Sequence, residues 1–282
     1  MNFHLNTAEI YIPDDAPEEK ALARTTHLCL AAHQDDIEIM AAQPIIECYQ
    51  QKDKWFTGVV VTDGRGSPRN GIYENYSDDE MRLVRFKEQR KAAFVGDFAA
   101  QIMLDIPSKV VKDASRPEPV DDIVEILRAT KPKAVYTHNL ADKHDTHIGV
   151  ALRVIEALRR LSPAERPERV VGCEVWRALD WMVDSDKVVM DLSHHENLQA
   201  ALLGVFDSQI AGGKRYDLAS MGRRRANATY FVSHGVDDAT GLSYGMDMTP
   251  LMNDANVNPL EFVREFIHRF ERDVCERVGR MR

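Results

Sequence analysis

The chain has 282 residues, of which 44% are hydrophobic, and its formal net charge at pH 7 is −9. This length allows one large α/β domain or two small ones, and the hydrophobic content excludes a mainly disordered chain. A net negative charge argues against nonspecific binding of nucleic acid, which depends on many contacts between basic side chains and phosphates. We therefore expect a globular protein without a nucleic-acid partner.

Residues 1–20 are polar and acidic, without the basic and apolar segments of a signal peptide. No apolar stretch approaches the roughly 20 residues that span a bilayer. The four cysteines contain no C-x-x-C pair and suggest no disulfide framework. These features predict a cytoplasmic protein without stable insertion into a membrane.

Residues 1–24 are expected to form an irregular lead-in, because prolines and aspartates interrupt any regular pattern. Beyond it, apolar runs rich in β-branched residues alternate with segments of helical spacing. The expected strands are residues 28–32, 56–62, 101–106, 133–137, 170–176 and 187–192. The expected helices are residues 37–52, 78–94, 119–129, 146–161, 196–211 and 259–278.

This alternation predicts an α/β fold with a mostly parallel sheet that is covered by helices on both faces. No linker divides the chain, so we expect a single domain over residues 1–282. Ligands of such sheets bind at the carboxyl ends of the strands. The residues that follow the expected strands are therefore the candidates for a functional site.

The first expected strand leads into the segment AAHQDDIE, which crowds a histidine and three acidic residues together. Neighbouring carboxylates repel each other, and a bound cation removes that repulsion. Imidazole and carboxylate are common zinc ligands, and His33 and Asp36 can converge on one ion while Asp35 stays free to act as a base. Alternatively, Asp35 or Asp36 caps the next helix and His33 is an ordinary loop residue.

Three of the ten histidines, His138, His144 and His147, follow the strand expected at 133–137. His144 and His147 are separated by two residues, so one can bind a metal while the other faces the reacting group. A polar loop that is rich in histidine by chance is the alternative. Two such clusters at the ends of two strands favour a shared metal site over that alternative.

These segments resemble a known family. AAHQDDIE resembles the AHPDDxE signature of the LmbE-like, or PIG-L, zinc-dependent N-deacetylases. HDTH and TDGRGS resemble the later His-x-x-His segment of the family and its loop after the second strand. The resemblance covers about residues 28–149, with a weaker match at 206–209. It implies a Rossmann-like three-layer α/β sandwich, a small N-acetylated sugar as substrate, and a homo-oligomer.

The resemblance makes His33, Asp36 and His147 the metal ligands and Asp35 the general base. It makes His144 the residue that polarises the carbonyl or stabilises the oxyanion. The cofactor that it implies is Zn²⁺, although two nitrogens and one oxygen also suit another divalent ion such as Fe²⁺.

The sequence departs from the family signature at two positions. Gln34 stands where the family has proline, which changes the constraints on that loop. Thr146 stands where the family often has an aspartate directly before the third ligand. Asp142 is a candidate to replace that carboxylate.

The loop over residues 62–69 should border the same pocket, and Arg65 or Arg69 is a candidate to bind a substrate hydroxyl, carboxylate or phosphate. A solvated turn is the alternative for this loop. The basic run Arg223-Arg224-Arg225 is more typical of a solvated helix face than of a site for an anionic substrate.

We therefore expect a metal-dependent hydrolase that removes an N-acetyl group from an amino sugar or a glucosamine-containing conjugate. One alternative is a metal-dependent hydrolase of another amide or an ester. The other is a non-catalytic protein of the same fold that binds a metal or small molecule. Asp35 favours catalysis, because a pure binding site needs no spare base beside the metal.

Overall fold

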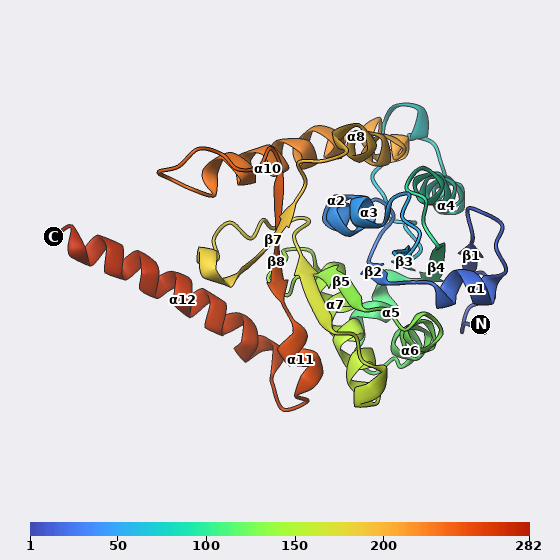
Figure 1. Cartoon of the computed structure of the whole chain (residues 1–282). Coiled ribbons are helices and arrows are strands. Elements are labelled where there is room, and N and C mark those ends of the chain that lie inside the picture. The colour runs from blue at the N-terminus through green and yellow to red at the C-terminus, as the bar shows by residue number, and fades with distance from the viewer.

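Runs of apolar and β-branched residues form one eight-stranded sheet in the computed structural model, which describes residues 1–282 (Figure 1). The runs at 56–62 and 100–106 are buried at every residue, as expected for strands that are covered on both faces. The strands are β1 (Glu9–Tyr11), β2 (His27–Ala31), β3 (Phe56–Thr62), β4 (Ala100–Ile106), β5 (Ala134–His138), β6 (Arg169–Cys173), β7 (Lys187–Asp191) and β8 (Leu242–Asp247).

The order of the strands in the sheet is β1-β4-β3-β2-β5-β6-β8-β7. The five central strands, from β4 to β6, pair in parallel, whereas β1, β7 and β8 pair antiparallel with their neighbours. From β2 the chain builds β3 and β4 on one side and later β5 and β6 on the other. The order therefore reverses between β2 and β5, where open α/β sheets bind their ligands.

Helices cover both faces of the sheet (Figure 1). Two separate clusters of buried apolar side chains fill the space between the sheet and these two helical layers. The helices are α1 (Glu18–Ala23), α2 (Asp36–Met40), α3 (Ala42–Cys48), α4 (Asp78–Val95), α5 (Ser108–Lys112), α6 (Glu118–Thr130), α7 (Asp145–Arg160), α8 (Glu196–Gly204), α9 (Asp207–Ile210), α10 (Tyr216–Tyr230), α11 (Thr249–Asn253) and α12 (Pro259–Arg280). Short 3-10 helices lie at Gly71–Tyr73, Pro163–Glu165 and Asp184–Asp186.

The structure confirms the predicted α/β sandwich with a mostly parallel sheet, but it corrects several elements. The expected irregular lead-in over residues 1–24 is wrong, because β1 adds to the edge of the sheet beside β4 and α1 packs near α6. The helix expected at 37–52 is two helices, since Pro44 has no N–H to continue one. The helix expected at 196–211 divides after Gly204.

Four further elements were not expected from the sequence: α5, α10, α11 and β8. The basic run at 223–225 lies inside α10. None of the helices combines the length and the apolar character that crossing a lipid bilayer requires.

Candidate active site

Three side chains meet where the strand order reverses. His33 and Asp36 lie between the end of β2 and the start of α2, and His147 lies in the first turn of α7. Nδ1 of His33 is 3.2 Å from Oδ2 of Asp36 and 3.2 Å from Nε2 of His147. Nε2 of His147 is 3.3 Å from the same Asp36 oxygen. The structure thus brings together the three residues that the sequence nominated as metal ligands.

The triangle of these three atoms fits a divalent cation. Ligand atoms at about 2.0 Å from a tetrahedral zinc ion lie about 3.3 Å from one another, close to the separations found here. The same separations are also hydrogen-bond distances, so His33, Asp36 and His147 are held together without a metal as well. Two imidazole nitrogens and one carboxylate oxygen are a donor set that zinc accepts.

Asp142 fixes the orientation of the His147 ring. Its Oδ2 lies 3.2 Å from Nδ1 of His147, and both side chains are buried. Nδ1–H therefore donates to the carboxylate, and the lone pair of Nε2 is left for a cation. Although burial opposes it, the Asp36 and Asp142 carboxylates raise the pKa of His147 to about 9, so metal binding would displace a proton from Nε2. Asp142 thus gives His147 a buried carboxylate partner.

The ionised form of Asp36 is stabilised by the neighbouring histidines. Burial opposes its ionisation, but the imidazole of His147 and the hydrogen bonds from its neighbours hold the pKa of Asp36 well below the usual range. The backbone N–H of His33 donates to Oδ2 of Asp36 at 2.8 Å. A carboxylate that stays ionised while buried is the form that a metal ligand requires.

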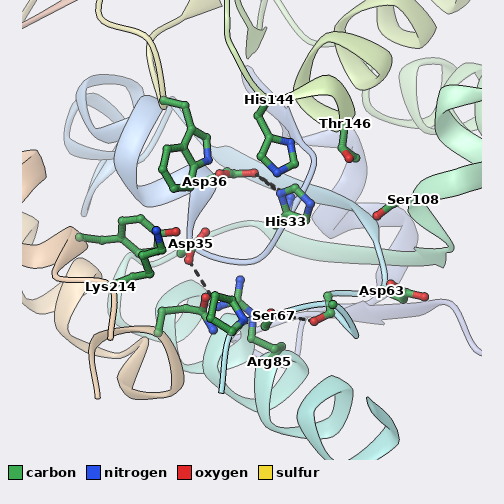
Figure 2. A pocket seen from close by; sticks show the side chains of 16 residues that line it. His33, Asp35, Asp36, Asp63, Ser67, Arg85, Ser108, His144, Thr146 and Lys214 are labelled. Atoms are coloured by element: carbon green, nitrogen blue, oxygen red, sulfur yellow. Dashed lines mark hydrogen bonds and ion pairs between the residues drawn. The ribbon is translucent and has the colours of Figure 1, made fainter. Parts of the chain in front are cut away.

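The neighbouring carboxyl, Asp35, behaves differently. Burial raises the pKa of Asp35 to about 7, against the opposing charge of Arg85. Nη1 of Arg85 lies 3.3 Å from Oδ2 of Asp35, a contact visible in Figure 2. Asp35 has φ +88° and makes no capping hydrogen bond to α2, so the capping interpretation does not hold for its side chain. Strained backbone of this kind tends to occur at functional sites.

His144 lies at the N-terminal end of α7, beside His33 (Figure 2), and its ring stacks on that of His147. Burial and the neighbouring His147 and His33 lower its pKa, so a neutral ring is favoured. Its Nδ1 is buried without a hydrogen-bond partner. A neutral imidazole can donate one hydrogen bond to a substrate oxygen, which suits the role expected for His144.

Asp35, Asp36, His33 and His144 line one cavity of about 460 Å³. Its wall is mainly polar and also includes side chains from distant parts of the chain. These additional lining residues are Asp63, Ser67, Arg85, Ser108, Thr146, Trp176, Gln209, Lys214 and Tyr216. Trp176 is half-buried and stacks near His144, with ring centroids 6.2 Å apart.

His138 is a site residue to which the sequence analysis gave no role. Its Nε2 lies 3.5 Å from Oδ2 of Asp36, and its ring stacks on that of His147. The backbone N–H of Ala32 donates to this Nε2 at 2.8 Å, so the nitrogen nearest the site is already an acceptor. His138 also forms a second group with Asp142 and His147 whose ligand atoms lie close enough together to hold a metal ion. Its place at the end of β5 is the clue that the sequence offered.

The two arginines that were candidates for substrate binding do not line this cavity. Arg65 pairs with Asp63 and Asp79, and Arg69 pairs with Asp78. Arg85, on α4, is the guanidinium that borders the cavity, and it is almost fully buried. The sequence pattern of α4 did not distinguish Arg85 from the other charged residues of that helix.

The basic run on α10 is mostly structural. Arg224 is buried and donates to the backbone carbonyls of Glu38 and Ile39, and Arg223 donates to the carbonyl of Val175. Only Arg225 fits the expected solvated face, where it pairs with Glu196. The run therefore ties α10 to its neighbours and contributes no guanidinium to the cavity.

Gln34, which replaces the proline of the family signature, joins two loops of the site. Its side chain is buried, and it accepts from Nε of Arg85 at 3.5 Å. Arg85 also donates to the Gln34 carbonyl. Gly64 adopts φ +68°, and a Cβ at that position would collide with Oε1 of Gln34. The loop after β3 is therefore packed directly against the segment that carries the ligands.

Residues 28–158 match the PIG-L family, described as GlcNAc-PI de-N-acetylase. The fold resembles that of several solved structures. One is N,N'-diacetylchitobiose deacetylase from Pyrococcus horikoshii, at 17% identity and a TM-score of 0.61, over 86% of this chain and 90% of that one. Another is the conserved protein TT1542 from Thermus thermophilus, at 20% identity and a TM-score of 0.60, over 77% and 92%.

A third similar structure is 4-carboxy-2-hydroxymuconate hydratase from Pseudomonas putida KT2440. It has 14% identity and a TM-score of 0.58, over 79% of this chain and 95% of that one. At these identities the likeness concerns the fold.

Proposed function

The chain belongs to the PIG-L family through residues 28–158, and from this premise we propose that it is a metal-dependent N-deacetylase of amino-sugar conjugates. The observation that carries the proposal is the triangle of His33, Asp36 and His147 beside the strained, buried carboxyl of Asp35. A binding protein needs the triangle alone, whereas hydrolysis also needs a base next to it.

His33, Asp36 and His147 would hold the cation, with zinc as the proposed metal. A divalent cation at that position supplies Lewis-acid activation of water and of an acyl oxygen. Asp142 keeps the Nε2 lone pair of His147 directed at the site, and Asp36 stays ionised in its buried position. These residues thus present two nitrogens and one oxygen without further rearrangement.

Asp35 is the proposed general base. It accepts a proton from the water that attacks the acetyl carbon, and it returns that proton to the nitrogen as the C–N bond breaks. Its pKa of about 7 suits both transfers near neutral pH. Arg85 holds the carboxylate in place through the contact of 3.3 Å. The products are acetate and a free amine.

His144 is the proposed donor to the oxygen on which negative charge develops. It lies next to His33, with ring centroids 5.1 Å apart, whereas Asp35 lies lower in the view of Figure 2. Removal of one donor of this type commonly costs roughly a hundred- to a thousandfold in rate. The lowered pKa of His144 favours the neutral ring, which carries one N–H to donate.

The cavity suits a sugar ring. A volume of about 460 Å³ accommodates a small molecule, and its wall combines many polar groups with the aromatic side chains of Trp176 and Tyr216. Sugars present hydroxyls at the rim of the ring and an apolar face, which aromatic rings can stack against. An N-acetylated sugar is therefore the proposed substrate class.

The decisive experiment measures release of acetate and of free amine from a panel of N-acetylated sugars, with the metal content determined on the same preparation. We expect activity that is lost on chelation and restored by a divalent metal. N-acetylated amino acids and simple esters serve as the comparison substrates. A protein that binds metal but releases neither product from any of them contradicts the proposal.

A second candidate reaction is the addition of water to a substrate, since a hydratase shares this fold. The same base and cation could activate water for that addition, or for hydrolysis of another amide or ester. The polar cavity with an aromatic wall favours the sugar amide. Acetate release separates hydrolysis from hydration, because a hydratase releases no second product, and the comparison substrates separate the sugar amide from other amides and esters.

A further inference from the structure

The C-terminal helix α12 extends away from the rest of the molecule, and its C-terminal end is free (Figure 1). Among its 22 residues only Phe266 is buried. From Val274 onward every residue is exposed. A short helical segment without contacts to the body is only marginally stable in water, so the free C-terminal part of α12 is expected to pack against a partner.

An apolar stripe runs along α12 and is exposed except at Val263, which is partly buried against the core. Its members recur alternately three and four residues apart, which is the spacing of positions a and d in a coiled coil. The stripe consists of Leu260, Val263, Ile267, Phe270 and Val274, and Met281 continues it after Arg277. Ile267 is 46% exposed, Phe270 39% and Val274 40%. Such a contiguous apolar surface on a soluble protein marks an interaction site.

The base of the stripe borders a groove on the body of the molecule. This groove has a volume of about 500 Å³, and Val263, Ile267 and Phe270 form one of its walls. Trp181 lies in the opposite wall, and its ring centroid is 6.2 Å from that of Phe270. An apolar helix that packed against the stripe would therefore also enter this groove.

The charged residues beside the stripe can form ion pairs between two copies of α12 that are related by a twofold axis. Arg264 and Glu271 both occupy position e of the heptad in which Ile267 is a and Phe270 is d. In an antiparallel pair centred between Ile267 and Phe270, Arg264 of each copy lies near Glu271 of the other. Two ion pairs form within the helix, one between Arg264 and Glu261 and one between Arg277 and Asp273. Glu271 takes part in neither of them.

A parallel pair gains no such contacts. In that arrangement residue g faces residue e of the next heptad, and this pairs Phe266 with Glu271 and Asp273 with Val278. A membrane surface is also a poor match for the helix. Its sequence carries five arginines and five acidic residues, so the charges cancel, whereas binding to anionic lipid needs an excess of basic residues.

We propose that α12 is a homodimerisation helix, which pairs antiparallel with α12 of a second copy of this chain around a twofold axis between Ile267 and Phe270. Ile267 packs against Phe270 of the second copy, and Val263 packs against Val274. The same contacts place the apolar stripe of each copy over the groove beside Trp181 of the other.

The test is the mass of the full-length protein in solution at micromolar concentration. We expect about 64 kDa, twice the chain mass of 32.0 kDa. Val274→Glu introduces a charge into the interface and should raise the dissociation constant by about a hundredfold or more. Arg272→Glu changes charge on the outer side of the same helix and should leave the mass unchanged. Circular dichroism checks that both variants are folded.

Charge reversal tests the antiparallel arrangement. Arg264→Glu and Glu271→Arg should each weaken the dimer by roughly tenfold, because each reversal creates two like-charge contacts. The double variant that carries both changes should recover the affinity of the original chain. Recovery is expected only when the two residues face each other across the axis.

Cys275 offers an independent measurement, since the other three cysteines are buried. The proposed register offsets the two Cys275 residues by about 13 positions, or about 20 Å along the axis, whereas a parallel pair sets them at the same height. The distance between spin labels on the two Cys275 residues distinguishes the antiparallel from the parallel pair.

A monomeric protein overturns the proposal. A dimer that Val274→Glu leaves intact also overturns it, and so does a monomer that binds lipid vesicles through α12.

Discussion

Oδ2 of Asp142 lies 3.2 Å from Nδ1 of His147, and this contact decides which nitrogen of the ring is free to bind a metal. The pair joins the loop after β5 to the first turn of α7, so residues close together in the chain supply both a candidate ligand and the side chain that orients it. The same carboxylate oxygen accepts from the backbone N–H of Trp176, which couples the ligand to the aromatic wall of the cavity.

Replacement of Asp142 by asparagine should weaken metal binding by about 10- to 100-fold, because the charge that stabilises the His147 tautomer is lost. Titration of the metal-free protein with zinc measures the effect. Asp145→Asn is the matched control, since Asp145 begins α7 three residues further on and is exposed. Equal affinities in the two variants would rule out an orienting role for Asp142.

Asp35→Asn should reduce turnover by roughly 10²- to 10⁴-fold while one metal per chain stays bound, because the amide cannot accept the proton. His147→Ala should lose the metal as well as the activity. Metal content and rate are measured together on each preparation. Full turnover in Asp35→Asn would exclude that residue as the base, and full metal occupancy in His147→Ala would refute the ligand assignment.

Arg85→Met should move the acidic limb of the rate–pH profile to higher pH. Burial raises the pKa of Asp35, and the positive charge of Arg85 opposes that rise. Loss of the charge therefore raises the pKa further, and the base is protonated over a wider range. Arg85→Lys keeps the charge and should keep the limb near its original position. An unshifted limb in Arg85→Met would show that another group controls it.

Gly64→Ala should destabilise the fold by at least about 1 kcal/mol, since it forces a side chain into the left-handed region and against Gln34. Gly66→Ala is the control in the same loop, where an added Cβ meets no atom within 4 Å. Thermal denaturation compares the two. The difference should shrink in the background of Gln34→Ala, which removes the collision but keeps the backbone strain.

The pairing of His4 with Asp122 should make stability depend on pH. The hydrogen bond to Asp122 raises the pKa of His4 above its usual value of 6.5. Its stabilising effect is complete below pH 6.5 and is lost as the pH rises through the higher pKa of the folded state. His4→Gln should thus lower the melting temperature more at about pH 6 than at about pH 9. His234→Gln, at an exposed position, should show no such difference.

Elements with strong local patterns were predictable from the sequence. The run at 56–62 coincides with β3, because β-branched residues in an unbroken apolar stretch fit a buried central strand. The three-residue strand β1 and the antiparallel β8 were missed, since both depend on neighbours far away in the sequence. Arg224 shows the same limit, because its burial depends on carbonyl groups of α2 that sequence spacing does not reveal.

The meeting of His33 with His147 followed from a general rule, that residues after neighbouring parallel strands converge at one edge of the sheet. The sequence offered no equivalent rule for Arg85, which reaches the cavity from the middle of α4. Arg65 and Arg69 looked like substrate ligands because only their loop was known. Their aspartate partners on α4 became apparent from the packing of that helix.

The backbone of Asp35 has one more consequence. Its φ of +88° is a conformation that costs a residue with a side chain about 1–2 kcal/mol, and glycine would adopt it freely. At this position glycine would make the folded state more stable, whereas the proposed general base requires aspartate. Stability and turnover therefore favour different residues, and the fold keeps a strained carboxylate beside the candidate metal ligands.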